Sequence, residues 1–299
     1  MGAVLGRLTR VGEDPAMDVL SDAIGAMRVG RPSLSPEVAD PSWETEVPPF
    51  EGARFYVGTA GRIRVAAPDE AVTLQPGDAV LLPHGIAHTL GNATGSTARF
   101  LSGTYRLERA RPHPLFQDLA DLVSLPAHED RYPGLQASID LLRGELDERM
   151  HGRDVVLPAL LEVLLVHLIR ACLRERAGSR ATGWCVALDD EVIARSLRAV
   201  HERPADPWTV ESLGAHAGLS RAAFARRFTA MVGQPPLTYL TWWRLTTAAR
   251  LLQTTDAPLA AVAQRSGYGS AYSFADAFKR EYGISAGRYR QQHRTRPPA

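Results

Sequence analysis

Features that mark whole classes of protein are scarce in this chain of 299 residues. There are two cysteines, Cys172 and Cys185, which are too few for a disulfide framework and are typical of a reducing cytosol. No run of about 18 uncharged apolar residues occurs, so no membrane span is predicted. Residues 1–11 contain arginines but no long apolar stretch, so no signal peptide is predicted either. The stretch before Met17 is expected to be a short disordered extension or the result of a mis-assigned start.

Acidic residues are scarce in the C-terminal third and in excess elsewhere. Residues 201–299 contain 13 Lys/Arg and 6 Asp/Glu, whereas the remainder carries 21 basic and 27 acidic residues. The formal net charge of +1 therefore hides a segregation of charge. A basic segment beside an acidic remainder indicates a polyanionic partner for the basic part, with an ordinary solvated surface as the alternative.

The N-terminal half has the hydrophobic pattern of β-structure. Residues 30–50 are rich in proline and serine, which predicts an extended or looping lead-in because proline disfavours helix and lacks a backbone donor. Residues 53–105 contain short β-type runs separated by turn signals such as Pro68-Asp69 and Gly91-Asn92. These runs predict an antiparallel β-barrel or sandwich.

The pattern changes to a helical period in the middle of the chain. Apolar residues over 115–123 fall on one predicted helical face, and longer helices are predicted over 135–150 and 155–173. The short connection around Gly152 predicts an antiparallel pair. The second helix is apolar enough to need a partner surface, which is either the barrel or a second subunit. Residues 174–183 are polar and small, and predict a linker.

Residues 209–233 have the pattern of a helix-turn-helix unit. Thr209 is a good N-cap for a short helix, Gly218 ends that helix, and Ser220 caps a second one. The predicted buried face of the second helix carries Phe224, Phe228 and Met231. Its outward face presents arginines, which pair with guanine edges or with phosphates.

The same pattern recurs over residues 259–283. A short helix ends at Gly267-Tyr268, and Ser270 opens a second helix with Phe274 and Phe278 on its predicted buried face. Between the two units, residues 236–252 predict one helix without a breaker, about 25 Å long at ~1.5 Å per residue. Such a connector would hold the two reading helices about 34–36 Å apart, one turn of duplex DNA.

The two units and their connector resemble the DNA-binding domain of AraC/XylS-type transcription regulators. The first half matches at Trp208-Thr209-Val210, Leu213, Leu219-Ser220-Arg221, Phe224, Arg227-Phe228 and Gly233. The connector matches at Pro236, Tyr239, Arg244, Ala248, Ala249 and Leu252. The second half matches at Ala260, Val262-Ala263, Gly267-Tyr268, Ser270, Phe274, Phe278-Lys279, Gly283 and Tyr289-Arg290. One helix-turn-helix would be weak evidence, whereas two in this order are specific.

The resemblance implies that outward positions on the second helix of each unit contact DNA. In the first unit these are Arg221, Ala222, Ala225 and Arg226. In the second unit they are Ala271, Tyr272, Ser273, Ala275, Asp276 and Lys279. Arg226 has the strongest case for base contact, whereas Asp276 can accept from a cytosine amine but repels phosphate. Arg227 and Arg280 are expected to be phosphate contacts or surface charges.

The predicted barrel carries a second resemblance. Gly77, Pro83, Gly85, His88 and Asn92 have the spacing of the second motif of cupin barrels. In metal-binding cupins that histidine is one ligand, and a His-x-His pair with a Glu supplies the others, none of which is evident here. A single His does not make a metal site, even with His84 beside it, so no metal and no cofactor is predicted.

A further resemblance is to the cupin-type sensor domain of one branch of AraC-like regulators. It rests on the segment Met17-Asp18-Val19-Leu20-Ser21-Asp22 together with the barrel that follows it. The resemblance implies an effector-binding barrel over residues 17–110 and dimerising helices over 111–178. The candidate effector-binding residues are Trp43, Phe55, Tyr56 and His88, with barrel packing as the alternative for each. Cys172 and Cys185 permit a thiol switch, with inert burial as the ordinary alternative.

The sequence thus predicts an α+β multidomain protein, with a cupin-like β-barrel, a helical dimerisation segment, and an all-α domain over residues 190–292 that contains two helix-turn-helix units. The predicted function is a bacterial, cytoplasmic, non-enzymatic transcription regulator, nucleoid-associated when bound to DNA. Its expected partners are double-stranded promoter DNA, a small-molecule effector, a second copy of the chain and RNA polymerase. The alternatives are a cupin-type metal-dependent enzyme with a DNA-binding-like tail, and a DNA-binding module that responds to a protein partner.

Overall fold

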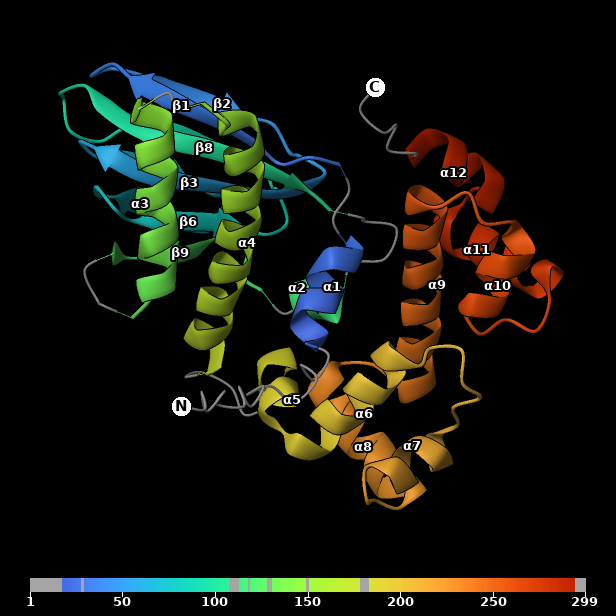
Figure 1. Cartoon of the computed structure of the whole chain (residues 1–299). Coiled ribbons are helices and arrows are strands. Elements are labelled where there is room, and N and C mark those ends of the chain that lie inside the picture. The colour runs from blue at the N-terminus through green and yellow to red at the C-terminus, as the bar shows by residue number, and fades with distance from the viewer. Residues whose placement is uncertain are drawn as a thin grey trace, which may run out of the picture.

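A computed structural model describes residues 18–27, 30–107, 113–117, 119–127, 131–148, 151–177 and 183–293. The extension expected before Met17, the centre of the linker at 178–182 and the last residues from Arg294 lie outside the described residues. Figure 1 shows a β-domain covered by two long helices, and a helical C-terminal domain beside it. The predicted division into a β-rich N-terminal part and a helical C-terminal part is confirmed.

The β-domain consists of two antiparallel sheets. The first has the order β1-β8-β3-β6-β9, with strands Ser33–Ala39, Ala98–Arg106, Gly52–Ala60, Ala79–Leu82 and Val123–Leu125. The second has the order β2-β7-β4-β5, with strands Glu44–Val47, His88–Asn92, Ile63–Ala66 and Ala71–Leu74. Side chains alternate along β3, so Phe55 and Val57 join the core beneath the helices while Tyr56 joins the core of the barrel.

Two local predictions differ from the structure. The lead-in at residues 30–50 contains strands β1 and β2, and Pro36 is tolerated in β1 because that strand lies at the edge of its sheet. The single helical face predicted over 115–123 is wrong. Helix α2 covers only Pro114–Gln117, and Val123 instead pairs with Leu81 of β6 as part of β9. Pairing with an open sheet edge outweighs the local helical period there.

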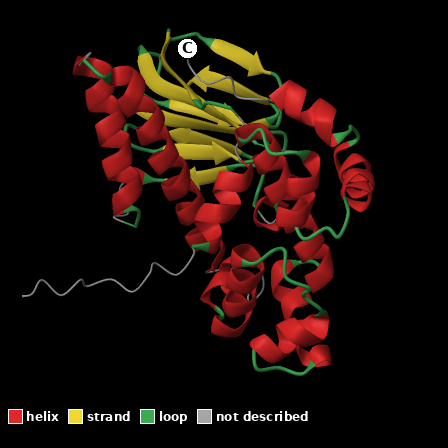
Figure 2. Cartoon of the chain, turned by 45° about the vertical axis from the view of Figure 1, so that its right-hand side comes forward, coloured by secondary structure: helices red, strands yellow, loops and turns green. Residues whose placement is uncertain are grey.

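Helices α3 (Pro133–Glu148) and α4 (Arg153–Ala177) form the predicted antiparallel pair and cover the first sheet (Figures 1 and 2). By length and composition, Arg153–Glu175 could cross a membrane. Core helices of soluble proteins have the same properties, and the inner face of α4 is buried in the main core through Leu161, Leu164, Leu165 and Leu168. We therefore interpret α4 as a core helix.

The C-terminal domain is a series of helices. They are α5 (Trp184–Asp189), α6 (Glu191–Glu202), α7 (Val210–His216), α8 (Arg221–Val232), α9 (Pro236–Thr254), α10 (Leu259–Arg265), α11 (Ala271–Tyr282) and α12 (Ala286–His293). The predicted connector is confirmed as α9, which ends at Thr254. In Figure 1 it runs from the α5–α8 group to the α10–α12 group.

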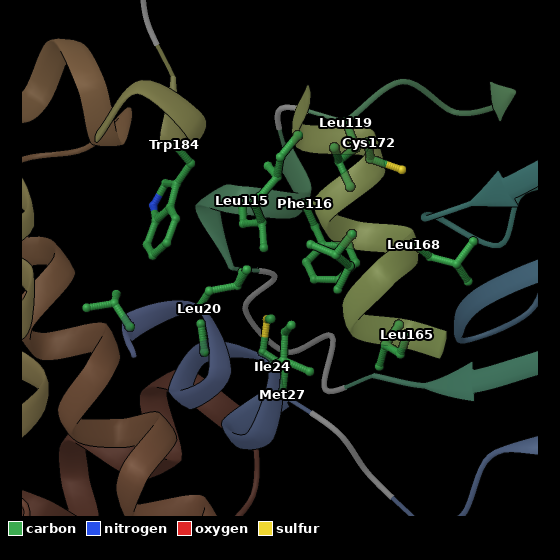
Figure 3. Packing of buried hydrophobic residues seen from close by; sticks show 14 of the residues in the cluster. Leu20, Ile24, Met27, Leu115, Phe116, Leu119, Leu165, Leu168, Cys172 and Trp184 are labelled. Atoms are coloured by element: carbon green, nitrogen blue, oxygen red, sulfur yellow. The ribbon is translucent and has the colours of Figure 1, made fainter. Parts of the chain in front are cut away.

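One continuous hydrophobic core links the β-domain to the first helix-turn-helix unit. Helix α1 (Val19–Met27) contacts α6 and α9, and its Leu20, Ile24 and Met27 point into this core together with residues of α2 and α4 (Figure 3). Cys172 is fully buried there. The second unit has a separate core built around Phe274 and Phe278. The first unit is therefore packed onto the β-domain, whereas the second is attached through α9.

Candidate DNA-binding surface and effector site

The first helix-turn-helix unit is defined by its caps. The Thr209 hydroxyl accepts a hydrogen bond from the Ser212 N–H at 3.0 Å, which fixes the start of α7. Gly218 has φ +75°, a left-handed conformation that a residue with a side chain rarely adopts, and it ends the α7 turn. The Ser220 hydroxyl then caps α8 by accepting from the Ala223 N–H. The predicted positions of both helices are confirmed.

Helix α8 separates buried from exposed side chains as its spacing predicts. Phe224 and Phe228 are fully buried, so their prediction as core residues is confirmed. The candidate contact residues lie on the other side: Arg221, Ala222 and Arg226 are exposed and Ala225 is half-buried. Arg226 has no ion pair with any residue that the structure describes, so its guanidinium is available to a ligand.

Arg227, the neighbour of Arg226, is instead committed to the fold. Its guanidinium forms an ion pair with Asp190, the residue that caps α6. Burial alone raises the pKa of Asp190, but the hydrogen bonds from Arg227 and the Ile193 N–H outweigh burial and lower that pKa below its usual value. The pair ties α8 to the start of α6, which fixes the first unit in place.

The second unit repeats this arrangement with a different exposed surface. Ser270 accepts from the Ser273 N–H at 3.1 Å, so Ser273 also belongs to the cap of α11. Tyr272 is 85% exposed. Asp276 lies 3.7 Å from Arg280, so an internal cation offsets its charge. Ala271, Ala275 and Lys279 are exposed on the same helix.

The second unit rests against the first through one close approach. Arg244 of α9 donates to the carbonyl oxygens of Pro204 and Asp206, each at 2.7 Å. Gly267 has φ +76°, and a Cβ there would lie 2.7 Å from the Arg244 Nε and 2.8 Å from the Pro204 oxygen. Glycine is required here by both conformation and space. The turn of the second unit is therefore seated on the segment that leads into the first.

Three of the four candidate effector residues lie together inside the barrel. The Tyr56 hydroxyl and the His88 Nε2 are 2.7 Å apart, and Trp43 packs on Phe100 with ring centroids 5.9 Å apart. Tyr56 belongs to the barrel core, and Trp43 packs against that core. The His88 ring contacts the Tyr56 ring. Phe55 points to the opposite side of β3, where it stacks on Tyr105 beneath the helices.

Both ring nitrogens of His88 are engaged. Nδ1 lies 2.8 Å from the Ile86 carbonyl oxygen, which can only accept, so Nδ1 carries the proton and Nε2 accepts from the Tyr56 hydroxyl. Burial lowers the pKa of His88, which favours this neutral form. Within the described ranges, no three His, Cys, Asp or Glu residues are grouped as metal ligands.

A cavity of about 580 Å³ opens beside this pair. His88 and Val47 line it, together with the Pro48-Pro49 segment and the end of β4. Gly85 anchors the segment, because its carbonyl accepts from the Phe50 N–H at 2.7 Å. A Cβ at Gly85, where φ is +54°, would lie 2.4 Å from the Phe50 carbonyl oxygen. The Pro-x-Gly turn of the cupin-like motif therefore shapes this end of the barrel.

Sequence reasoning missed Arg54. It lies two residues before Tyr56 on β3, so both side chains leave the same side of the strand, toward the barrel interior. Its guanidinium lies over the Phe50 ring at 5.4 Å. The sequence did contain a signal: Arg54 and Tyr56 are two residues apart in a predicted strand, so a charged side chain falls on the same side as an interior tyrosine.

Comparisons with known proteins agree with this arrangement of domains. A cupin family model matches residues 18–174, which is more than half of the chain, and a helix-turn-helix domain model matches residues 213–292. A cupin domain followed by paired helix-turn-helix units defines a class of DNA-binding regulators. The enzyme alternative finds no support among the named relatives, which are transcription regulators.

The relatives identify the family. The chain is 31% identical to an AraC-like transcription regulator of Streptomyces antibioticus, over 92% of this chain and 99% of the relative. It is 32% identical to the RCS-specific transcriptional activator RclR of Escherichia coli, over 82% of this chain and 86% of the relative. The chain therefore belongs to the AraC-like transcription regulators, and the predicted family, fold class and DNA-binding regulatory function are confirmed.

Solved structures with related folds were also found. The DNA-binding domain of AdpA, solved with a target DNA, is 36% identical and covers 35% of this chain and 95% of that domain, with a TM-score of 0.33. ToxT of Vibrio cholerae, solved with an unsaturated fatty acid, is 11% identical and covers 90% of this chain and 97% of ToxT, with a TM-score of 0.39.

Proposed function

We propose that this regulator reads promoter DNA with the outward faces of α8 and α11, and that a small effector bound in its barrel controls that binding. The proposed functional divisions are a sensor barrel over residues 17–110, a dimerising segment over 111–178 and a DNA-binding domain over 190–292. The proposed location is the bacterial cytoplasm, with nucleoid association when DNA is bound. The observation that carries the proposal is the free, exposed Arg226 beside the ion-paired Arg227.

Arg226 is the proposed base-reading residue of the first unit. It is exposed on a helix whose opposite face is locked in the core by Phe224 and Phe228. A guanidinium held in this way can reach the O6 and N7 acceptors of guanine in the major groove. On α11 the proposed contact surface is formed by Tyr272, Ser273, Asp276 and Lys279, with Ala271 and Ala275 allowing close approach. The proposed contact surface of α8 is therefore cationic, whereas that of α11 combines aromatic, hydroxyl, acidic and basic side chains.

Arg226→Ala should weaken specific DNA binding by about 1–3 kcal/mol, roughly 5- to 150-fold, because a bidentate base contact is lost. Binding is measured at fixed salt on the promoter fragment of the protein's own gene and on a scrambled fragment of equal composition. Only the affinity for the specific fragment should fall strongly. Arg64→Ala, on an exposed position of β4, is the charge-matched control. Equal losses on both fragments would show that Arg226 contacts only phosphate.

The barrel is the proposed effector site. Its support is the adjoining cavity of about 580 Å³ and the buried Tyr56–His88 hydrogen bond, which places polar groups where a small molecule can meet them. Strand β3 lies between this site and the continuous core, with Tyr56 on the barrel side and Phe55 and Val57 in the core that reaches α6 and α9. Strand β3 is therefore the proposed physical connection between this site and the first reading helix. A change of packing in the barrel would therefore act on the first unit before the second.

Helix α4 is the proposed dimerisation surface. Val155 is 76% exposed and Val163 is 46% exposed, and with Ala159 between them they form an apolar stripe at a spacing of four residues on the outward face. A second copy of the same stripe would remove these side chains from water in a two-fold interface.

Val163→Asp should convert a dimer into a monomer, because it places a charge within the apolar stripe. Molar mass is measured by light scattering at low micromolar protein. Leu237→Asp, which introduces the same charge at an exposed apolar position of α9, should leave the mass unchanged. A variant at Val163 that keeps the wild-type mass would place the dimer interface elsewhere.

A further inference from the structure

The interior face of the first sheet carries a ladder of polar residues at one end of the barrel. Arg54 of β3 pairs with Thr104 of β8, and Tyr56 pairs with Ser102 in the next interior register. Directly paired residues point to the same face, with Cβ atoms about 4.5–5.5 Å apart. Arg54, Thr104, Tyr56 and Ser102 therefore share one surface, which faces the barrel interior rather than the helices.

Arg54 is a half-buried cation without a counter-ion. Its Nε is buried and has no hydrogen-bond partner among the residues that the structure describes, and no ion pair involves it there. The Phe50 ring covers the guanidinium at 5.4 Å. Burial raises the pKa of Tyr56, and the nearby Arg54 guanidinium partly opposes that shift. Removing part of a guanidinium from water is unfavourable unless its donors are satisfied, so this arrangement is incomplete as it stands.

The neighbours of Arg54 do not supply the missing negative charge. The proton of the Tyr56 hydroxyl is donated to His88 Nε2, because His88 Nδ1 donates its own proton to the Ile86 carbonyl. Tyr56 and His88 are thus a neutral pair on the face of β3 that Arg54 shares. Glu37, the acid that acts on Tyr56 electrostatically, is exposed on β1. The cluster keeps the full positive charge of Arg54.

The cluster adjoins the cavity of about 580 Å³. His88 is the shared member, since it lines the cavity and holds the Tyr56 hydroxyl. The segment that lines the cavity with Pro48 and Pro49 continues directly into Phe50, the ring that covers Arg54. A small molecule in the cavity would therefore lie close to two cations, Arg54 and Arg106, whose guanidinium groups lie 5.4 and 5.8 Å from the Phe50 ring. Glu46 is the one carboxylate among the described residues that line the cavity, so an anion would have to bind at the end nearer Phe50.

We propose that Arg54, Tyr56 and His88 form an oxyanion subsite, and that the effector of this regulator carries a carboxylate or another oxyanion. This inference rests on the proposed effector site in the barrel. The oxyanion accepts from the Arg54 guanidinium, with Ser102 and Thr104 hydroxyls beside it on β8. Charge-assisted hydrogen bonds of this kind are the strong ones, and the planar guanidinium matches a carboxylate.

The test is thermal unfolding of the full-length protein, without DNA, at constant ionic strength. The probes are phenylacetate, acetate and inorganic phosphate, with phenylacetamide as the neutral analogue of the first and sodium chloride as the salt control. A ligand of the native state raises the Tm with its concentration. Phenylacetate, or phosphate if the natural ligand is inorganic, should raise the Tm, and phenylacetamide should not. Arg54→Gln should weaken the binding about 10- to 100-fold, and Arg64→Gln should not.

A second variant tests the same subsite from the opposite direction. Thr104→Asp places a carboxylate directly opposite Arg54, at the paired position of β8. The free protein should then have a higher Tm, and its response to the acids should be lost, because the site is filled internally. Retention of the acid response in Arg54→Gln or Thr104→Asp overturns the proposal, as does a wild-type protein that responds to none of the anions. Equal responses to phenylacetate and phenylacetamide also overturn it, but would leave effector binding in the barrel intact.

Discussion

Phe278→Ala should unfold the second helix-turn-helix unit on its own, at a cost of about 3–5 kcal/mol. Phe278 is fully buried and packs on Tyr282 and Tyr289, with ring centroids 4.3 and 5.3 Å away. These side chains belong to a core that is separate from the one linking the β-domain to the first unit. Loss of the ring therefore removes stability from α10, α11 and α12 without creating a cavity in the larger core.

Hydrogen exchange followed by mass spectrometry would measure this effect segment by segment. In Phe278→Ala, amides of α11 and α12 should lose protection while those of α4 and α8 keep it. On DNA, the protected footprint should shorten by about one major-groove window. Phe228→Ala is the matched control, because Phe228 is equally buried but belongs to the continuous core. It should expose α8 together with α6 and α9. Loss of protection in α4 of Phe278→Ala would show that the two cores unfold as one.

The architecture of the DNA-binding domain was predictable from sequence because its signals are local. Thr209, Ser220 and Ser270 are caps whose partners lie three residues away, and Gly218 ends a helix through its own φ angle. The phenylalanine pairs of α8 and α11 recur four residues apart, so a helical period alone assigns them to the core. The contact residues follow as the remaining face, although their roles at DNA stay predictions.

The features that the sequence did not predict depend on partners far away in the chain. Val123 lies in a strand because β6 offers it an unpaired edge. The hydrophobic pattern of residues 115–123 carries no information about that edge. The free charge of Arg54 depends on which side chains β1, β8 and the Phe50 segment bring near it. The packing of α1 on α6 and α9 joins residues nearly two hundred positions apart, such as Asp22 and His201. Tertiary contacts decide these features.

The seam between the β-domain and the DNA-binding domain contains two buried histidines. His201 of α6 lies with Nε2 2.7 Å from the Tyr239 hydroxyl and Nδ1 3.5 Å from the Asp22 carboxylate. His113 is fully buried between Trp184 and Trp242, with ring centroids 4.3 and 4.7 Å away. Burial lowers the pKa of both histidines; the charge of His201 lowers that of His113 further, while Asp22 partly opposes the shift at His201.

Stability should therefore fall as the pH is lowered below about 6.5, the value for a histidine in the unfolded chain. Below about pH 6.5 the histidines of the unfolded chain bind protons, whereas the same histidines in the folded protein stay neutral because their pKa values are lower. Their contribution to the free energy of unfolding is therefore fully present above about pH 6.5 and is lost as the pH falls below it. Each histidine adds at most about 1.4 kcal/mol per pH unit to this slope. Urea unfolding midpoints between pH 7.5 and 5.0 measure the loss.

His113→Asn isolates the contribution of one histidine. In the wild-type protein the Leu115 N–H donates to the His113 Nδ1 at 3.0 Å. The side-chain oxygen of asparagine can accept the same hydrogen bond, but asparagine does not titrate. The variant should be less stable at pH 7.5, because the ring is lost from an aromatic cluster, yet its stability should depend less on pH. His151→Asn, in the exposed turn between α3 and α4, should retain the wild-type slope. An unchanged slope in His113→Asn would assign the acid sensitivity to His201 or to groups outside the seam. A reduced slope would mean that acid acts on the contact between His113 and the aromatic residues Trp184 of α5 and Trp242 of α9.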